Sequence, residues 1–376
     1  MHAVIPSGDL SVLLKIGYSP LKHDPVKDPD AAGYGRIAVK DGRLVIESSS
    51  TTMAARGVGE CEGEDGYCCV PLESLSDMLK VMPDGEDAVL DYKDQKLLLK
   101  VGKSKCSFGC LHPDALAPLG TPPADVPGIE VELDALVKSI GAAAVSGEPN
   151  DADGIRSNVL LAATDKGFHA VATDNIRCSI VPVEATYEGE FKGTVSIKGS
   201  KALKTFESET VKIVELGESI LFMDGDSFIQ FQQSTQVLKS FPDFRPIMDV
   251  KHIDEVKMST ERFTTLMAGA RKINPQECIL TVEDEEVVVT NLRSEDGTEY
   301  RGVTAYDGEP GYGIRVGIAP LLVAEYLKTL KSDSLSLLFS QERNELDSPS
   351  HILIKDEDGS WFFVKSLVCL IETPNI

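Results

Sequence analysis

The strongest candidate for chemistry in this sequence is Asp174, in the segment VATDNIR that ends at Arg177. The small and apolar residues before Asp174 predict a strand, so its carboxylate would stand at a strand end. A carboxylate in that position can act as a general base if it reaches a proton of a substrate. An aspartate and an arginine at this spacing more commonly form an ion pair within a turn. We interpret the two residues as such a turn and predict no catalytic residue.

The cysteines and histidines are too scattered to predict a metal site. The sequence has 6 histidines without an H-E-x-x-H motif, and 8 cysteines without a C-x-x-C pair. Zinc sites need ligands clustered at such spacings. We therefore predict no metal, no cofactor, and ordinary reduced thiols at Cys61, Cys68, Cys69, Cys106, Cys110, Cys178, Cys278 and Cys369.

Sequence motifs of common enzyme classes and of membrane or export signals are also missing. We find no G-x-S-x-G, no P-loop and no G-x-G-x-x-G between a strand and a helix. No apolar run reaches the roughly 18 residues of a membrane helix, and the start MHAVIPSGDL has no basic region followed by an apolar stretch. These features predict a cytoplasmic protein that is not an enzyme and does not associate with membranes.

Three segments of similar pattern form the framework that must position any functional residue. They begin at Val70, Val195 and Val316, about 120 residues apart, and each runs from a short strand into a helix and then into further strands. A second set of helices precedes them, in GDLSVLLKIGYS, ELDALVKSIGAAAV and STERFTTLMAGARKI. The repetition predicts three tandem domains, each a doubled unit of one helix with several strands.

Local patterns indicate where the helices and strands lie. Leu133, Leu136 and Ile140 fall on one face of an amphipathic helix, and Ser259 is a suitable N-cap for the helix that follows it. Apolar runs between turn residues predict strands at 88–92, 96–101, 219–224, 228–233, 287–290, 335–340 and 351–356. We also expect a strand at 234–240, before a Pro-Asp turn. Many strands with a pair of helices per unit indicate an α+β class.

The segments VATDNIRCSIV (171–181), VSIKGSKALKTF (195–206) and KSFPDFRPI (239–247) resemble the second domain of the bacterial sliding clamp, the beta subunit of DNA polymerase III. That family has V-A-T-D-x-x-R, a V-x-P-x-K helix start and an F-P-D-[YF] turn in this order. VPLESLSDMLKVMPDGE (70–86) is similar to the first domain, and VGIAPLLVAEYLKTLKSDSLSL (316–337) to the third. The resemblance covers almost the whole chain.

This resemblance implies three clamp domains, at 1–126, 127–250 and 251–376. Two subunits would join head to tail into a homodimeric ring around duplex DNA, with helices inside and sheets outside. The ring would bind DNA without regard to sequence and tether a DNA polymerase, a clamp loader and other proteins that carry a clamp-binding motif. The clamp itself would perform no chemistry.

The charge at first disagrees with DNA binding, because 37 Lys and Arg stand against 60 Asp and Glu, a net charge of −23. Proteins that grip phosphates are normally basic. A topological tether needs only a mildly positive inner wall. Basic residues do gather on the predicted helices and their ends, and Lys198, Lys201 and Lys204 are expected at the start and middle of one helix. The DNA-facing candidates are Lys15, Lys22, Lys27, Lys80, Lys138, Lys198, Lys201, Lys204, Arg271, Lys272, Lys328 and Lys331.

The family also implies a groove for client peptides between the second and third domains, with Arg177 at its rim. By position it would involve Arg156, Thr173, Asn175, Ile176, Arg177, Cys178, Pro242, Pro246, Ile247, Phe363, Val364, Leu367 and Val368. The chain has Asn-Ile-Arg-Cys at 175–178 where the family usually has G-[HY]-R-L. At the dimer contact it has Cys106 where an aromatic residue is common, expected opposite Ile273.

Two alternatives stay open from the sequence. One is an enzyme that reuses a clamp-like scaffold, which would require a pocket of convergent polar residues. The other is a divergent clamp paralogue, of a phage or mobile element, that acts as a scaffold for its own polymerase.

Overall fold

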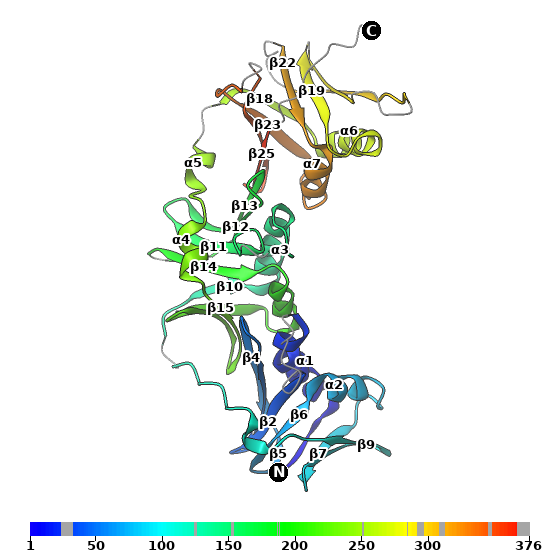
Figure 1. The fold of residues 1–376 in the computed structure, drawn as a ribbon, viewed down its shortest axis with the longest axis vertical. Helices are drawn as coiled ribbons and strands as arrows, with labels where there is room; N and C mark the ends of the chain where they lie inside the picture. The colour runs from blue at the N-terminus through cyan, green and yellow to red at the C-terminus, as the bar shows by residue number, and fades with distance from the viewer. Residues whose placement is uncertain are drawn as a thin grey trace. The chain divides into compact units, whose positions relative to one another are not determined.

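The computed structural model describes residues 1–23, 33–123, 126–151, 154–185, 187, 189–249, 252–283, 285–291, 297–307, 313–344 and 348–366 (Figure 1). Contacts group the chain into two compact units. The first unit comprises Met1–Val137, Glu184–Glu188 and Gly193–Lys239, and the second comprises Lys138–Val183, Gly189–Lys192 and Ser240–Ile376. Each unit thus combines one terminal repeat with part of the central repeat. The three predicted domain boundaries stay a prediction.

Two antiparallel sheets form the framework of the first unit. The smaller sheet has the strand order β5 (Glu62–Glu64), β1 (His2–Pro6), β7 (Asp87–Lys93), β8 (Lys96–Val101) and β9 (Ser104–Gly109). The larger sheet has the order β10 (Ile129–Glu132), β15 (Thr210–Leu216), β16 (Ser219–Asp224), β17 (Ser227–Gln232), β4 (Met53–Glu60), β3 (Arg43–Ser49), β2 (Tyr34–Lys40) and β6 (Gly66–Pro71). The pairing of β17 with β4, in which Phe228 lies opposite Arg56, joins two repeats in one sheet.

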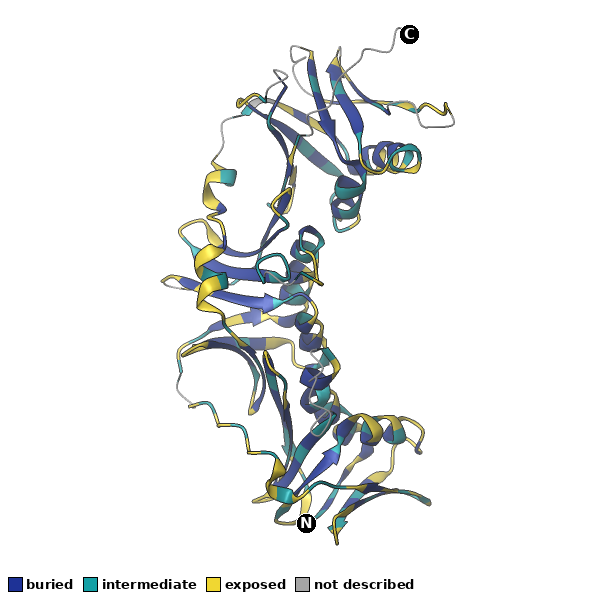
Figure 2. Cartoon of the chain, in the orientation of Figure 1, coloured by how far each residue is buried: buried dark blue, intermediate teal, exposed yellow. Residues whose placement is uncertain are grey.

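Helix α1 (Ser7–His23) is the central helix of this unit and contacts α2 (Leu72–Lys80) and the 3-10 helix η3 (Gly199–Thr205). Its buried residues include Leu10, Leu14 and Leu21, which recur at helical spacing. They pack with Leu75 of α2 and apolar residues of both sheets in one core. Figure 2 shows the result along α1 and α2, which have buried residues on one face and exposed residues on the other. A further 3-10 turn, η1 (Pro113–Ala115), follows β9.

The second unit also contains two antiparallel sheets. The larger one has the order β11 (Asn158–Thr164), β12 (Gly167–Thr173), β13 (Arg177–Pro182), β25 (Trp361–Lys365), β24 (His351–Asp356), β23 (Ser334–Ser340) and β18 (His252–Ser259). The smaller one has the order β21 (Arg301–Ala305), β20 (Glu286–Thr290), β19 (Cys278–Glu283) and β22 (Ile314–Ile318). Strand β14 (Phe191–Ser196) begins in this unit.

The remaining helical elements belong to the second unit or span its chain boundaries with the first. Helix α3 (Leu133–Ala143) begins in the first unit and continues into the 3-10 turn η2 (Ala144–Ser146) of the second. Helix α4 (Thr235–Ser240), nearly all of which belongs to the first unit, precedes the short α5 (Arg245–Met248). Helices α6 (Thr260–Ile273) and α7 (Pro320–Leu327) contact each other and share a core with both sheets. None of the described helices is long and apolar enough to cross a bilayer.

Most predicted elements are confirmed, including the α+β class and the N-cap at Ser259, whose Oγ accepts a hydrogen bond from the Arg262 amide at 3.4 Å. The strand predicted at 234–240 is wrong, because that segment forms α4. There the Ser234 hydroxyl accepts a hydrogen bond from the Val237 amide, and the Ser234 carbonyl accepts one from the Leu238 amide. This local capping starts a helical turn in spite of the alternating pattern.

The helix expected in the segment 195–206 is η3, a 3-10 helix rather than an α-helix. Its Ser200 and Thr205 hydroxyls donate hydrogen bonds to carbonyls three residues earlier, at 2.9 and 2.7 Å. Gly199 is packed so closely that a Cβ atom there would lie 2.5 Å from the Ser196 Oγ. Lys198 is the N-cap and Lys204 lies in the last turn, so the expectation that Lys204 occupies the middle of the helix is wrong.

Candidate functional site

The segment singled out by sequence forms a tight polar turn between β12 and β13. The Asp174 carboxylate accepts hydrogen bonds from the backbone amides of Ile176 and Arg177, at 3.0 and 2.9 Å. Asn175 has the left-handed backbone angle φ of 74°, which asparagine tolerates better than most residues. The Thr173 hydroxyl donates to the Arg177 carbonyl at 2.7 Å. The interpretation of Asp174 and Arg177 as an ion-paired turn is confirmed.

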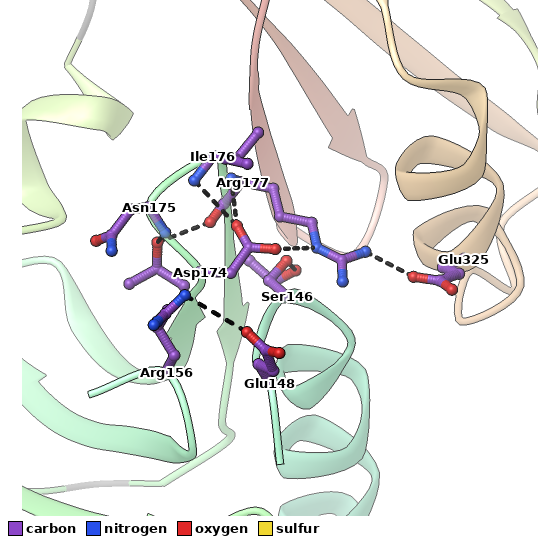
Figure 3. A network of polar contacts seen from close by, with 10 residues as sticks. Ser146, Glu148, Arg156, Asp174, Asn175, Ile176, Arg177 and Glu325 are labelled. Atoms are coloured by element: carbon purple, nitrogen blue, oxygen red, sulfur yellow. Dashed lines mark hydrogen bonds and ion pairs between the residues drawn. The ribbon is translucent and has the colours of Figure 1, made fainter. Parts of the chain in front are cut away.

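Arg177 lies between two carboxylates, as Figure 3 shows. Its Nε donates to Asp174 at 2.9 Å, and its Nη1 donates to Glu325 of α7 at 2.7 Å. The Arg177 side chain is only 9% exposed, against 38% for Glu325. Both contacts hold the guanidinium largely inside the protein, and the position of Arg177 at the rim of a client groove stays a prediction. Glu325 was missed from the sequence, since only the fold brings it to Arg177.

Strand pairing brings the C-terminal part of the predicted groove beside this turn. In the register of β13 and β25, Arg177 lies opposite Val364 and Cys178 lies opposite Phe363. Val364, Cys178 and Thr173 are buried. These three side chains are packed in the interior, and their part in a client groove stays a prediction. Phe363 is partly exposed and stacks obliquely with the ring of His351 at 4.7 Å between centroids.

The accessible surface near the turn is apolar. Ile176 is 48% exposed, which makes it one of the few exposed large apolar residues among those that the structure describes. Asn175 beside it is exposed as well. An exposed isoleucine presented by a rigid turn is suited to contact an apolar group of a partner.

Arg156, another residue of the predicted client groove, forms ion pairs with nearby carboxylates. Its guanidinium donates to both carboxylate oxygens of Asp151, at 3.0 and 2.9 Å. It also reaches Glu148 at 3.5 Å, the contact that Figure 3 shows. A bidentate pair of this kind fixes the direction of the arginine plane. The side chain stays about a third exposed, at 32%.

The segment 241–247, which contains Pro242 and Pro246, is held in place by its buried phenylalanine side chains. Phe244 is buried and lies 5.7 Å from the His169 ring of β12, measured between centroids. Pro242 and Pro246 are exposed and Ile247 is partly exposed. Burial lowers the pKa of His169, whose buried Nδ1 has no hydrogen-bond partner in the described structure. Of the remaining groove predictions, Leu367 and Val368 lie outside the described residues.

The described residues of the first unit that were predicted to face DNA lie on its helical elements or at their ends. Lys15, Lys22, Lys80, Lys198, Lys201 and Lys204 are all exposed, on α1, α2 and η3. Helices α1 and η3 contact each other, and the pKa of His23 is lowered by burial and then by the positive charges of Lys22 and Lys201. Lys80 forms an ion pair with Asp77 at 2.8 Å. Lys27 lies outside the described residues.

In the second unit the corresponding residues lie on α3, on α6 and just after α7. Lys138, Lys272, Lys328 and Lys331 are exposed and Arg271 is partly exposed. Arg271 and Lys272 occupy the last turn of α6, where a cation also complements the helix dipole. Each unit therefore presents cations from its helical elements.

Comparison with solved structures gives one consistent result. The DNA polymerase III subunit beta of Pseudomonas aeruginosa matches with a TM-score of 0.84 and 17% sequence identity, over 98% of this chain and 100% of that one. The chain has the fold of a bacterial sliding clamp. The DNA polymerase III beta subunit of Thermotoga maritima gives a TM-score of 0.83 at 17% identity, over 98% and 99%. The Helicobacter pylori beta clamp bound to a DNA ligase peptide gives 0.79 at 16%, over 98% and 100%. No protein-family model and no curated protein matches the sequence.

Within this clamp fold, the two residues predicted at a dimer contact occupy separate elements. Cys106 lies on β9, the strand at one edge of its five-stranded sheet, and is partly buried. Ile273 is the last residue of α6 and is also partly buried. An edge strand has unpaired backbone groups that can pair with another chain.

Among the residues that the structure describes, no group of three or more His, Cys, Asp or Glu side chains is placed to hold a metal ion. The polar residues that do converge, Asp174, Arg177 and Glu325, neutralise one another through ion pairs.

Proposed function

We propose that this protein is a DNA sliding clamp, a processivity factor that encircles duplex DNA as a homodimer and tethers a DNA polymerase. The clamp fold over 98% of the chain carries the proposal. A clamp of this kind performs no reaction, and its work is the topological linkage of a polymerase to its template.

The distribution of charge supports a ring that holds DNA without gripping it. The net charge is −23, yet exposed lysines lie on the helical elements of both units. A strongly basic surface would bind phosphates tightly and slow sliding. Scattered lysines at a helical wall give a weak, sequence-independent attraction instead. We infer that Lys15, Lys198, Lys201 and Lys204 face the DNA.

A client site on the second unit follows from the polar turn and its surroundings. We assign the docking of client peptides to the surface around Ile176, and propose that Asn175, Arg156, Pro242 and Phe363, which are exposed or partly exposed, also contribute to it. The Helicobacter pylori clamp, which shares this fold, is bound to a DNA ligase peptide. DNA polymerase and the clamp loader are the expected clients. The unusual Ile176 and buried Cys178 predict a preference for motifs that differ from the common one.

Ring closure requires a second copy of the chain. We propose that the edge strand β9, with Cys106, meets the partner subunit near its Ile273 region, because an edge strand offers backbone groups for intersubunit pairing. Substituting Ile273 by Asp would place a charge in this contact and should produce a monomer. Val81→Asp, at an exposed residue after α2, is the matched control.

The decisive experiment combines mass and DNA topology. Light scattering at micromolar concentration should give twice the subunit mass of 40.6 kDa. After loading by a clamp loader onto nicked circular DNA, the protein should stay bound through a high-salt wash and leave once the circle is cut. A monomeric mass, or retention that ignores the DNA ends, would overturn the proposal.

A further inference from the structure

A row of side chains crosses four strands of the larger sheet in the first unit. Arg36 of β2 lies opposite Cys69 of β6 on one side and opposite Glu47 of β3 on the other. Glu47 also lies opposite Arg56 of β4. Residues that are directly opposite each other in antiparallel strands point to the same face of the sheet. Cys69, Arg36, Glu47 and Arg56 therefore form one polar row on that face.

The segment 111–123, which follows β9, is fastened to this polar row near both ends of the row. At one end the Cys69 thiol donates a hydrogen bond to the Pro113 carbonyl at 3.2 Å. At the other end Arg56 donates from Nη1 to the Thr121 hydroxyl at 3.0 Å and from Nη2 to the Leu119 carbonyl. The Leu119 side chain also packs against an apolar cluster on β15, β16 and β17. The middle of the segment is thus held over the sheet between two attachments.

A cavity of about 470 Å³ is lined by this middle part of the segment and by residues of β2 and β3. The segment contributes the apolar side chains of Leu116 and Pro118. The sheet contributes Arg36, Tyr34 and Ser49. Tyr34 and Ser49 each lie two positions along a strand from a member of the polar row, so they share its face. Cavities of roughly 300–1,000 Å³ are the usual size for binding one small molecule.

The polar row contains one more positive charge than negative charge. The Glu47 carboxylate, whose side chain is only 2% exposed, accepts hydrogen bonds from Arg36 Nη1 at 3.1 Å and from Arg56 Nε at 2.9 Å. One buried carboxylate thus faces two guanidinium groups. A charge that is largely removed from water is costly unless an opposite charge accompanies it. The row is therefore predisposed to attract an anion.

Arg36 is the member of the row that can reach such an anion. Among the described residues, its guanidinium makes one hydrogen bond, to Glu47, and its side chain is partly exposed where it lines the cavity. The ring of Tyr67 lies 4.7 Å from the guanidinium carbon and covers it. The Asp114 carboxylate accepts a hydrogen bond from the Tyr67 hydroxyl at 2.8 Å, and no ion pair joins it to Arg36 among these residues. Donor groups of Arg36 are thus left for a ligand.

We propose that this cavity binds a small organic anion, a carboxylate or a phosphate monoester with an apolar body. The guanidinium of Arg36 donates to the anionic oxygens, since its planar set of N–H groups matches the oxygens of either group. The hydroxyls of Tyr34 and Ser49 supply further donors. Leu116 and Pro118 cover the apolar body of the ligand. Glu47 is a positioning residue, because its ion pair with Arg36 fixes the direction of the guanidinium.

This site is independent of the proposed clamp function. It uses none of the residues that we assign to DNA, to client peptides or to the partner subunit. Failure of either proposal can therefore be recognised separately.

The test is ligand-observed saturation-transfer NMR of the full-length protein with sodium benzoate and with phenyl phosphate. We expect saturable binding of at least one of them in the millimolar range or tighter, and the tighter of the two identifies the anionic group. Benzylamine, a cation of similar size, should bind at least about tenfold more weakly, because it meets an arginine. Absence of saturable binding by both anions, or equal binding of benzylamine, would overturn the proposal.

Variants place the binding in this cavity. Arg36→Met should weaken binding of the tighter anion at least about tenfold, because a charge-assisted pair is lost. Ala117→Trp, at an exposed residue of the cavity wall, should block binding while Arg36 stays in place, and it keeps the test open if Arg36→Met does not fold. Arg43→Met, at an exposed arginine of β3 outside the cavity, is the matched control and should bind like the wild-type protein. Unchanged binding by a folded Arg36→Met or Ala117→Trp protein would contradict the assignment.

Discussion

Arg177 of β13 and Glu325 of α7 are joined by a hydrogen bond of 2.7 Å across 148 positions of sequence. The same guanidinium binds Asp174, in the turn that presents Ile176. A buried arginine with two carboxylate partners holds its surroundings in one arrangement, because leaving any of these charges unpaired in the interior is costly. The turn and α7 are thus fastened to each other inside the second unit.

Replacing Arg177 by Met should destabilise the protein by about 2 to 4 kcal/mol, because two carboxylates lose their partner in a largely buried place. Glu325→Gln should cost less than about 1 kcal/mol, since Glu325 is more than a third exposed and water screens its charge. Urea unfolding of the two variants measures the difference. Equal losses would show that the network does not depend on the buried arginine.

The lysines of η3 should control contact with DNA. The triple variant Lys198→Glu, Lys201→Glu and Lys204→Glu should weaken binding to short duplex DNA at low salt. If all three contact phosphates, the slope of log K against log salt should fall by about 3. Fluorescence anisotropy over a salt series measures this slope.

Its control is a triple Lys→Glu variant with the same change in charge at Lys40, Lys93 and Lys355, exposed residues that lie on strands. If DNA contacts only the helices, the slope of log K against log salt for this variant should stay close to that of the wild-type protein. An identical loss in both triple variants would mean that only net charge matters, and the assignment of the η3 lysines would fail.

Ile176 should contribute directly to client binding. Ile176→Ser removes an exposed apolar side chain whose burial by a peptide is worth about 1.5 kcal/mol, or roughly tenfold in affinity. Titration of a fluorescent clamp-binding peptide gives the affinity, and urea unfolding should show a stability change within about 0.5 kcal/mol. Val81→Ser, also at an exposed apolar residue, should leave peptide affinity unchanged. Unaltered peptide binding by the Ile176 variant would move the client site elsewhere.

Stability should fall on mild acidification, in part through His169. Burial lowers its pKa in the folded protein, so below the ordinary value of about 6.5 the unfolded chain takes up the proton first. The contribution of His169 to the free energy of unfolding should therefore be constant above about pH 7.5. Below about pH 6.5 it should decline by at most about 1.4 kcal/mol per pH unit.

The His169→Gln variant should show a shallower decline between pH 7 and 5 than the wild-type protein, whatever its stability at pH 8. Urea unfolding at several pH values provides the comparison. Parallel pH profiles would show that His169 does not contribute, leaving His23, His252 and His351, whose pKa values burial also lowers.

Local sequence was sufficient for features that depend on neighbouring residues. The amphipathic spacing in 133–140, the Ser259 cap and the pairing of Asp174 with Arg177 all involve groups within a few positions of one another. Their geometry follows from helix periodicity and turn formation, which a short segment can adopt by itself. Because these local patterns recur in three tandem repeats, they also indicated the α+β class, and motifs within the repeats carried the resemblance to the clamp family.

Tertiary structure alone decided which residues meet across the chain and which are accessible. The register of β13 against β25 buries Val364 and Cys178, and packing of α7 brings Glu325 to Arg177. Close packing at Gly199 accompanies a 3-10 helix where periodicity suggested an α-helix. Burial and strand register depend on partners distant in sequence, whose identity the local pattern of one segment does not specify.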